Sequence, residues 1–231
     1  MNLKTSNSHA SSHYYDWERT DAIDFLLKNV GDSNLIKNVL ELGCGTAKTA
    51  SLLMKSLPIK SYKGIEKKTN AAEKAGEILT QVVMADFEDM IKTKDYQGLN
   101  NDRYDLIVLL DVLEHLIDPW TAMNILTSWL NEGGYVLCSI PNAGNYYVLK
   151  KLFLNRFDYE DRGILDKTHL RFFTFSTINN LFNQCGLTIE KRTTNSDLYI
   201  LKLKIFNILT FGVFNKQFVR QFILIARKAA H

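Results

Sequence analysis

The chain has 231 residues, of which 46% are hydrophobic and 23% are charged. These proportions fit one globular domain whose core needs no disulfide staple. The formal net charge of +3 is too small to be evidence for a nucleic-acid partner.

The spacing of the cysteines and the composition of the first residues indicate the cellular compartment of the protein. Cys44, Cys138 and Cys185 are widely spaced and form no CxxC pair, which argues against a disulfide framework and a structural zinc site. We therefore expect no metal. The polar start MNLKTSNSHASSHYYDW lacks the apolar core of a signal peptide, and no run has the length of a membrane span. A cytoplasmic protein is the expectation.

Strand and helix patterns alternate along the first part of the chain. The amphipathic helix at 17–30 is followed by strands at 38–42, 61–66, 81–85, 104–110 and 134–140, and by helices at 46–57, 69–79 and 119–130. The apolar run YDLIVLL is typical of a central parallel strand buried on both faces. We expect Thr46 to cap the second helix.

Residues 143–217 are less regular and rich in aromatic side chains. Helices are expected at 146–154 and 176–185, the second capped by Ser176, and two further strands at 187–193 and 218–227. The aromatic residues of this region could line an acceptor pocket or, as we expect for most of them, form core beneath a lid. They are Tyr146, Tyr147, Phe153, Phe157 and Tyr159.

These elements predict a doubly wound α/β fold. Its sheet would have seven mostly parallel strands with helices on both faces, and its last strand would be antiparallel. We expect a single domain over 1–231, with a helical cap at 1–35, a ligand-binding core at 36–142 and acceptor or lid elements within 143–217. The apolar stretch 198–214 could be a lid, a contact between subunits of a homo-oligomer or a membrane-surface helix.

The stretch VLELGCGTAKTA at 39–50 brings a backbone close to a ligand. Gly43 and Gly45 stand after a strand and before a helix, and Glu66 follows about 20 residues later, as in nucleotide-binding turns. Lys48 occupies the third-glycine position of the dinucleotide pattern, and Glu41 precedes the first glycine. This favours a ligand with a cationic amino-acid tail over a pyrophosphate.

Acids mark the ends of four successive strands. Glu41 lies in the first strand, and Glu66, Asp86 and Asp111 end the next three. The carboxyl ends of parallel strands meet at one edge of a sheet, where ligands of such folds bind. A ligand with hydroxyl groups and positive charge explains the set better than four separate helix caps do.

Four segments together carry a family resemblance. VLELGCGTAKTA, KGIE, VVMADFED and YDLIVLLDVLEHLIDPW, at these intervals over about 35–142, resemble the class I S-adenosylmethionine-dependent methyltransferases. The resemblance implies S-adenosyl-L-methionine as cofactor. The later stretch LDKTHLRFFTF resembles bacterial enzymes of the ubiquinone and glycan O-methyltransferase type, which favours O-methylation of a small metabolite or a sugar unit.

The resemblance also implies cofactor residues at the methionine end. Glu41, Gly43 and Gly45 would border the methionine part, and Leu110 would line the pocket at the end of the fourth strand. Arg19 resembles the arginine that reaches the cofactor carboxylate in a related subgroup, although an arginine on a helix surface is the simpler interpretation.

At the nucleoside end the resemblance implies three further residues. Glu66 would hold both ribose hydroxyls, and Asp86 would accept from the adenine amino group. Phe87 would lie beside the adenine ring.

Two histidines are candidate catalytic bases. His115 follows the fourth strand in LDVLEH, and His169 lies in LDKTHLRFF beyond the fifth. A base is needed only if the acceptor must lose a proton, as a hydroxyl must. Positioning the loop is the alternative role for His115, and simple solvation the alternative for His169.

Three functional alternatives stay open. A nucleic-acid methyltransferase is disfavoured, because LDVLEH stands where the (D/N/S)PP(Y/F) segment of amino methyltransferases would be. An RNA or protein acceptor and a catalytically silent S-adenosylmethionine-binding regulator are the others. Sustained turnover would exclude the regulator.

Overall fold

The computed structural model describes residues 18–196, 205, 208–209, 211–213 and 215–229. Most of the apolar stretch 198–214 therefore lies outside the described residues. This includes its two lysines, Lys202 and Lys204. No helix within the described ranges is long and apolar enough to cross a bilayer.

The core of the fold is one seven-stranded sheet in the order β3-β2-β1-β4-β5-β7-β6. Only β7 runs antiparallel to its neighbours, β5 and β6, so the predicted mostly parallel sheet with an antiparallel last strand is confirmed. The strands are β1 (Asn38–Leu42), β2 (Ser61–Ile65), β3 (Gln81–Val83), β4 (Tyr104–Leu110), β5 (Leu130–Pro141), β6 (Leu187–Ser196) and β7 (Val219–Lys228).

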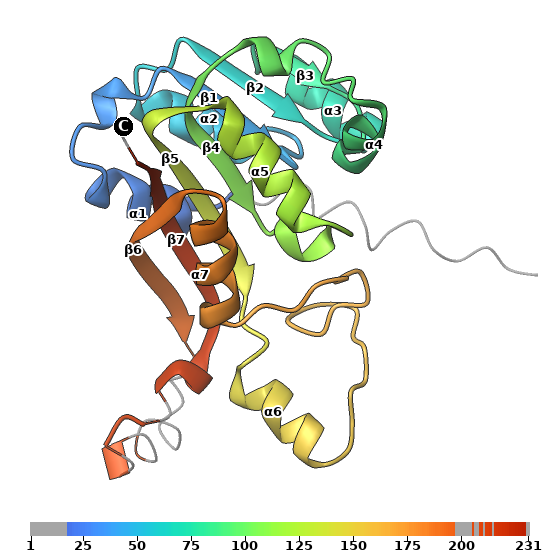
Figure 1. Cartoon of the computed structure of the whole chain (residues 1–231), viewed down its shortest axis with the longest axis vertical. Helices are drawn as coiled ribbons and strands as arrows, with labels where there is room; N and C mark the ends of the chain where they lie inside the picture. Colours follow the sequence, from blue (N-terminus) through green and yellow to red (C-terminus); the bar gives the residue numbers. More distant parts are fainter. Residues whose placement is uncertain (1–17, 197–204, 206–207, 210, 214, 230–231) are drawn as a thin grey trace, which may run out of the picture.

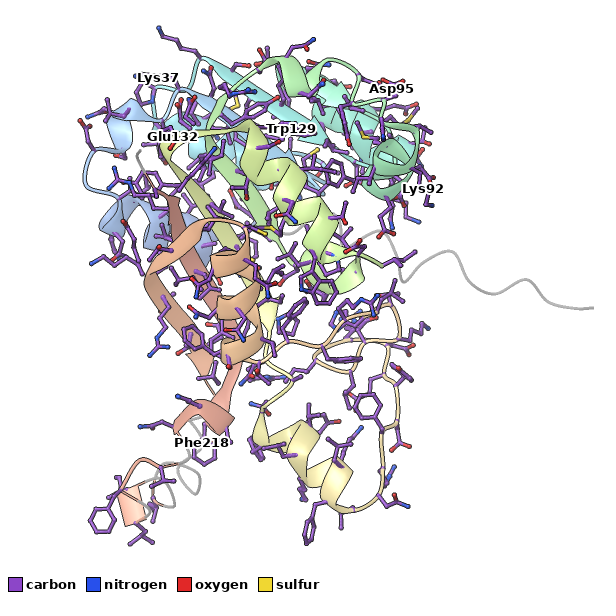
Figure 2. The ribbon with its side chains drawn as sticks, viewed as in Figure 1. Lys37, Lys92, Asp95, Trp129, Glu132 and Phe218 are labelled. Atoms are coloured by element: carbon purple, nitrogen blue, oxygen red, sulfur yellow. The ribbon has the colours of Figure 1, made fainter. Side chains whose placement is uncertain are left out.

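The strand order reverses between β1 and β4. These two strands pair in parallel, with Glu41 opposite Val108, while β2 and β3 extend the sheet to one side and β5 to the other. In Figure 2, Lys37 and Glu132 lie near the amino ends of β1 and β5, and Phe218 lies toward the opposite edge. That opposite, carboxyl edge is the switch point at which doubly wound folds bind ligands.

Helices cover both faces of the sheet (Figure 1). One apolar cluster joins α1 and α2 to a face of the sheet and includes Ala75 of α3; the other joins α4, α5 and α7 to the opposite face. Such two-sided burial accounts for the continuous apolar run of β4. The helices are α1 (Thr20–Asn29), α2 (Lys48–Ser56), α3 (Thr69–Gly76), α4 (Phe87–Thr93), α5 (Pro119–Trp129), α6 (Tyr146–Phe153) and α7 (Phe175–Gln184).

Two expectations about helix caps were wrong, and one helix was not predicted. Residue Ala47, in left-handed conformation, precedes α2 and makes no side-chain cap, so Thr46 does not cap this helix. Thr174, in a capping box with Thr177, replaces Ser176 as the cap of α7. Helix α4 was not predicted, because seven residues with only Phe87 and Met90 buried give too short a periodic signal.

The aromatic side chains around α6 are not core. Figure 1 shows α6 and the loop after it beyond the carboxyl edge of the sheet. Phe153 is 90% exposed, and Tyr147, Phe157 and Tyr159 are exposed as well. The expectation that most of these rings are buried was therefore wrong, because the buried cluster beside α6 is small and consists of Val148, Ile164 and Leu165.

Candidate functional site

The glycine turn occupies the carboxyl end of β1. The Gly43 N–H donates to the carbonyl of Ile65 at 2.8 Å, which ties the turn to the end of β2. Gly43 and Gly45 have φ angles of 74° and 54°, a region that favours glycine. A side chain at Gly43 would also approach Val112 Cγ2 to 3.1 Å. The turn therefore needs glycine for both conformation and space, and it leaves backbone close to the switch point.

Glu66 stands directly beside this turn. Its carboxylate is buried and accepts hydrogen bonds from the Gly45 N–H at 3.0 Å and from the Lys68 N–H at 2.8 Å. These bonds fix the carboxylate at the end of β2. A carboxylate has about four acceptor positions, so both oxygens can still accept from a ligand hydroxyl pair.

Glu41, in β1 just before the turn, is buried in the interior. The residue is 4% exposed, and its carboxyl group accepts a hydrogen bond from the Tyr62 hydroxyl at 2.7 Å. Burial raises the pKa of Glu41 to about 7, against the opposing effect of Tyr62 and with a further increase from the charge of Glu66. The side chain is thus held by Tyr62 and can hold a proton near neutral pH.

Asp86 lies in the connection after β3 and is the N-cap of α4. Its Oδ1 accepts from the Glu88 N–H at 2.9 Å as the cap of the helix, and Lys67 Nζ lies 3.8 Å from Oδ2. The next residue, Phe87, is 3% exposed and packs edge-on against Trp129. The ring of Phe87 therefore belongs to the core and offers a ligand little surface, whereas Asp86 remains accessible.

Arg19 and Asp111 meet at the ends of β4 and β5. Arg19 Nη1 donates to Asp111 Oδ2 at 2.6 Å and to Ser139 Oγ at 2.9 Å, while its Nε donates to Asp21. Gln221, at the start of β7, also donates to Asp111. The guanidinium thus lies at the carboxyl edge, as expected if it faces a ligand there, but it is already held by two carboxylates.

Leu110 completes this part of the edge. It is half-buried as the last residue of β4, directly before Asp111. The contributions of Ser139 and Gln221 were not predicted. No sequence signal distinguishes them, because Gln221 approaches Asp111 only through the antiparallel pairing of β7 with β5.

The two candidate histidines lie against each other. His115 ends a short 3-10 turn, η4 (Leu113–His115), and the centroids of its ring and that of His169 are 4.9 Å apart. Nδ1 of His115 lies 3.1 Å from the Thr168 carbonyl, and Nδ1 of His169 lies 3.0 Å from the Ile164 carbonyl. A carbonyl only accepts, so each Nδ1 carries hydrogen and each neutral ring has a free lone pair on Nε2.

Burial affects the charge of His115. His169 is 7% exposed and His115 is half-buried. Burial lowers the pKa of His115 below its ordinary value, and the neighbouring His169 adds to the effect. We therefore expect a neutral His115 ring, whose Nε2 can accept a proton, at neutral pH.

Glu114 connects the two histidines. Its backbone carbonyl accepts from the N–H groups of Leu170 and Arg171 at 2.8 and 3.0 Å, which fixes the His169 loop against η4. The Glu114 side chain is 2% exposed, and neither carboxylate oxygen has a hydrogen-bond partner among the residues described. Burial, and then the charge of Asp111, raise the pKa of Glu114 well above its ordinary value.

Comparison with known proteins identifies the family. Residues 13–192 match a family model described as a methyltransferase domain. The chain belongs to this methyltransferase family. The prediction of a methyltransferase is thereby confirmed at the level of the family, and the acceptor is left open. A search of curated proteins gave no match to the chain.

Solved structures share the fold at low sequence identity. A SAM-dependent methyltransferase from Archaeoglobus fulgidus has a TM-score of 0.64 at 18% identity, with 94% of this chain and 97% of that chain covered. The N-methyltransferase NodS from Bradyrhizobium japonicum, in complex with S-adenosyl-L-homocysteine, has a TM-score of 0.56 at 16% identity, with 90% and 86% covered. These similarities support the Rossmann-like methyltransferase fold.

Proposed function

We propose that this methyltransferase transfers the methyl group of S-adenosylmethionine to an oxygen atom of a small metabolite or a sugar unit. The observation that carries the proposal is the position of two sites at one edge of the sheet. Glu66 and the glycine turn lie at the ends of β1 and β2, and the His115–His169 pair follows the end of β4.

The donor would bind along the carboxyl edge. Glu66 would accept from both ribose hydroxyls, and Asp86 from the adenine amino group. Gly43 and Gly45 would lie under the methionine part, and Arg19 would face its carboxylate. Support comes from the buried carboxylate of Glu66, fixed by two backbone N–H groups, and from the absence of a side chain at Gly43 and Gly45.

The transfer itself would be an in-line displacement. A lone pair of the acceptor oxygen forms the new C–O bond, and the S–CH₃ bond breaks with its electron pair going to sulfur, which leaves S-adenosylhomocysteine. The acceptor hydroxyl gives its proton to Nε2 of His169, with His115 beside it. Positioning accounts for most of the acceleration in such a reaction, and a base adds about 10²–10⁴-fold.

A hydroxyl acceptor is favoured by the availability of a base. The hydrogen bonds of both Nδ1 atoms to carbonyls leave the Nε2 lone pairs free, whereas an ionised carboxylate acceptor would not need them. The exposed aromatic residues on and after α6 would bind the acceptor, since flat apolar rings contact sugar and phenol faces.

The test is a panel of phenols, sugars and carboxylates with S-adenosylmethionine labelled in its methyl group. We expect label in a hydroxyl compound, and a decrease of at least about tenfold in turnover for His169→Ala with little change in donor affinity. Lys167→Ala is the matched control, since Lys167 is exposed in the same loop and pairs only with Asp161 among described residues.

Two results would contradict the proposal. Turnover of His169→Ala equal to wild type would remove this residue as the base. Binding of the donor without turnover of any acceptor would favour the silent regulator instead.

A further inference from the structure

Glu114, His115 and His169 form a second chemical cluster within the proposed acceptor site. One potential ligand atom of each residue lies within 4.8 Å of those of the other two. Among the described residues, it is the one group of three or more His, Cys, Asp or Glu side chains placed closely enough to share a metal ion. We propose that these three side chains bind a divalent transition-metal ion.

The histidines have the tautomer that metal ligation needs. Each Nδ1–H is directed to a backbone carbonyl, of Thr168 or of Ile164, so the lone pair for a metal is on Nε2. Histidine ligands in metalloproteins typically donate their other ring N–H in this way, which fixes the ring and raises its basicity. The two carbonyls therefore orient both rings before any ion binds.

Glu114 supplies the second, independent observation. The residue is 2% exposed, and neither carboxylate oxygen has a hydrogen-bond partner within the described part of the chain. A buried polar group without a partner is costly, and a buried carboxylate more so. Arg19 acts on it only through its charge, because its hydrogen bonds go to other groups. A cation at the cluster would remove this cost.

The ligand types indicate which ions fit. Two imidazoles and one carboxylate suit Zn²⁺, Fe²⁺, Co²⁺ or Mn²⁺ better than Mg²⁺ or Ca²⁺, which prefer oxygen ligands. Ligand atoms at about 2.1 Å from a tetrahedral Zn²⁺ lie roughly 3.4 Å apart. The cluster must therefore contract on binding, and this requires movement of half-buried His115 on its short turn. Three protein ligands leave a coordination position open.

The ion would change the role of the two histidines. With both Nε2 lone pairs bound to metal, neither ring can take a proton. An acceptor oxygen in the open position would instead have its own pKa lowered by the ion. This consequence rests on the proposed function, whereas the binding of the ion does not.

Calorimetric titration of Zn²⁺ into the full chain, freed of metal by a chelator and without methyl donor or acceptor, tests the binding. We expect one saturable site per chain, at least about tenfold weaker in His169→Ala and in Glu114→Gln. The control removes the other three histidines, His9, His13 and His231, in one variant. That variant should bind Zn²⁺ like wild type.

The proposal is overturned if wild type shows no saturable site. It is also overturned if binding is lost in the control and kept in Glu114→Gln. Circular dichroism checks that each variant is folded, and Glu114→Gln is the variant that keeps the shape of the side chain. Methyl transfer by wild type without Zn²⁺ binding would overturn the metal site and leave the proposed function standing.

Discussion

At the scale of single residues, Glu66 and Glu41 have different tasks although both are buried acids at the carboxyl edge. Glu66 is directed to the turn and the open edge, whereas Glu41 is directed to Tyr62 inside the molecule. The sequence predicts both as acids near a ligand. It does not separate the acid that would contact the ligand from the acid that bonds to Tyr62, because the Tyr62 contact depends on the packing of β1 against β2.

Glu66→Ala should weaken binding of S-adenosylhomocysteine by about 1.5–3 kcal/mol, because charge-assisted hydrogen bonds to the ribose would be lost. Isothermal calorimetry measures this affinity. Glu73→Ala, an exposed acid on the neighbouring α3, is the control and should bind as wild type does. An unchanged Kd for Glu66→Ala would refute the ribose assignment.

Glu41 should make stability depend on pH. The ordinary pKa of a glutamate, 4.5, applies to the unfolded chain, and the pKa of Glu41 is about 7 in the folded chain. Between these values the folded state keeps a proton that the unfolded state releases. The contribution of Glu41 to the free energy of unfolding is therefore fully present below about pH 4.5. It is lost as the pH rises toward about 7, and the loss amounts to about 3 kcal/mol. Urea unfolding at pH 5 and pH 8 should show this loss in wild type and not in Glu41→Gln. Parallel losses in the two proteins would contradict it.

At the scale of elements, the residues of the candidate site lie in the turns after the strands. The conformation of these turns could be predicted only in part from the sequence. The glycine turn was predictable because Gly43 and Gly45 adopt conformations that favour glycine. The left-handed Ala47 before α2 was not, since alanine gives no signal for it. Helix α4 was also missed, although its cap, Asp86, was singled out as a ligand residue.

Asp86 therefore has two tasks that substitution can separate. Asp86→Ala should lose the cap, which costs about 1 kcal/mol of stability, and should also weaken donor binding. Asp86→Ser should keep the cap, because serine is a good capping residue, yet it is too short to reach the adenine. Thermal unfolding and calorimetry measure the two effects. Donor affinity of Asp86→Ser equal to wild type would show that the carboxylate contributes only to the helix.

At the scale of the whole molecule, alternation of strands and helices was sufficient to predict the architecture. The order of the last strands was not predictable, because β7 enters between β5 and β6 and no local pattern records which neighbour a strand pairs with. That pairing brings Gln221 to Asp111. Similarly, His115 and His169 were predicted as separate candidates, and only the loop fixed by the Glu114 carbonyl brings them together.

Ligand binding should stabilise the molecule as a unit, because the proposed donor site joins turns from β1, β2 and the β3–α4 connection. S-adenosylhomocysteine at about 100 times its Kd should add about 2.7 kcal/mol. For a chain of this size that corresponds to a rise in Tm of roughly 5–10 °C. Differential scanning calorimetry measures the shift. Adenosine diphosphate is the control, and an equal shift with it would argue against a site selective for the donor.

The most direct measurement is a crystal structure of the chain with S-adenosylhomocysteine bound. The account predicts that the ribose hydroxyls contact Glu66, that the adenine lies by Asp86, and that the sulfur faces the His115–His169 pair. A product bound elsewhere, or one whose sulfur faces away from the two histidines, would contradict it.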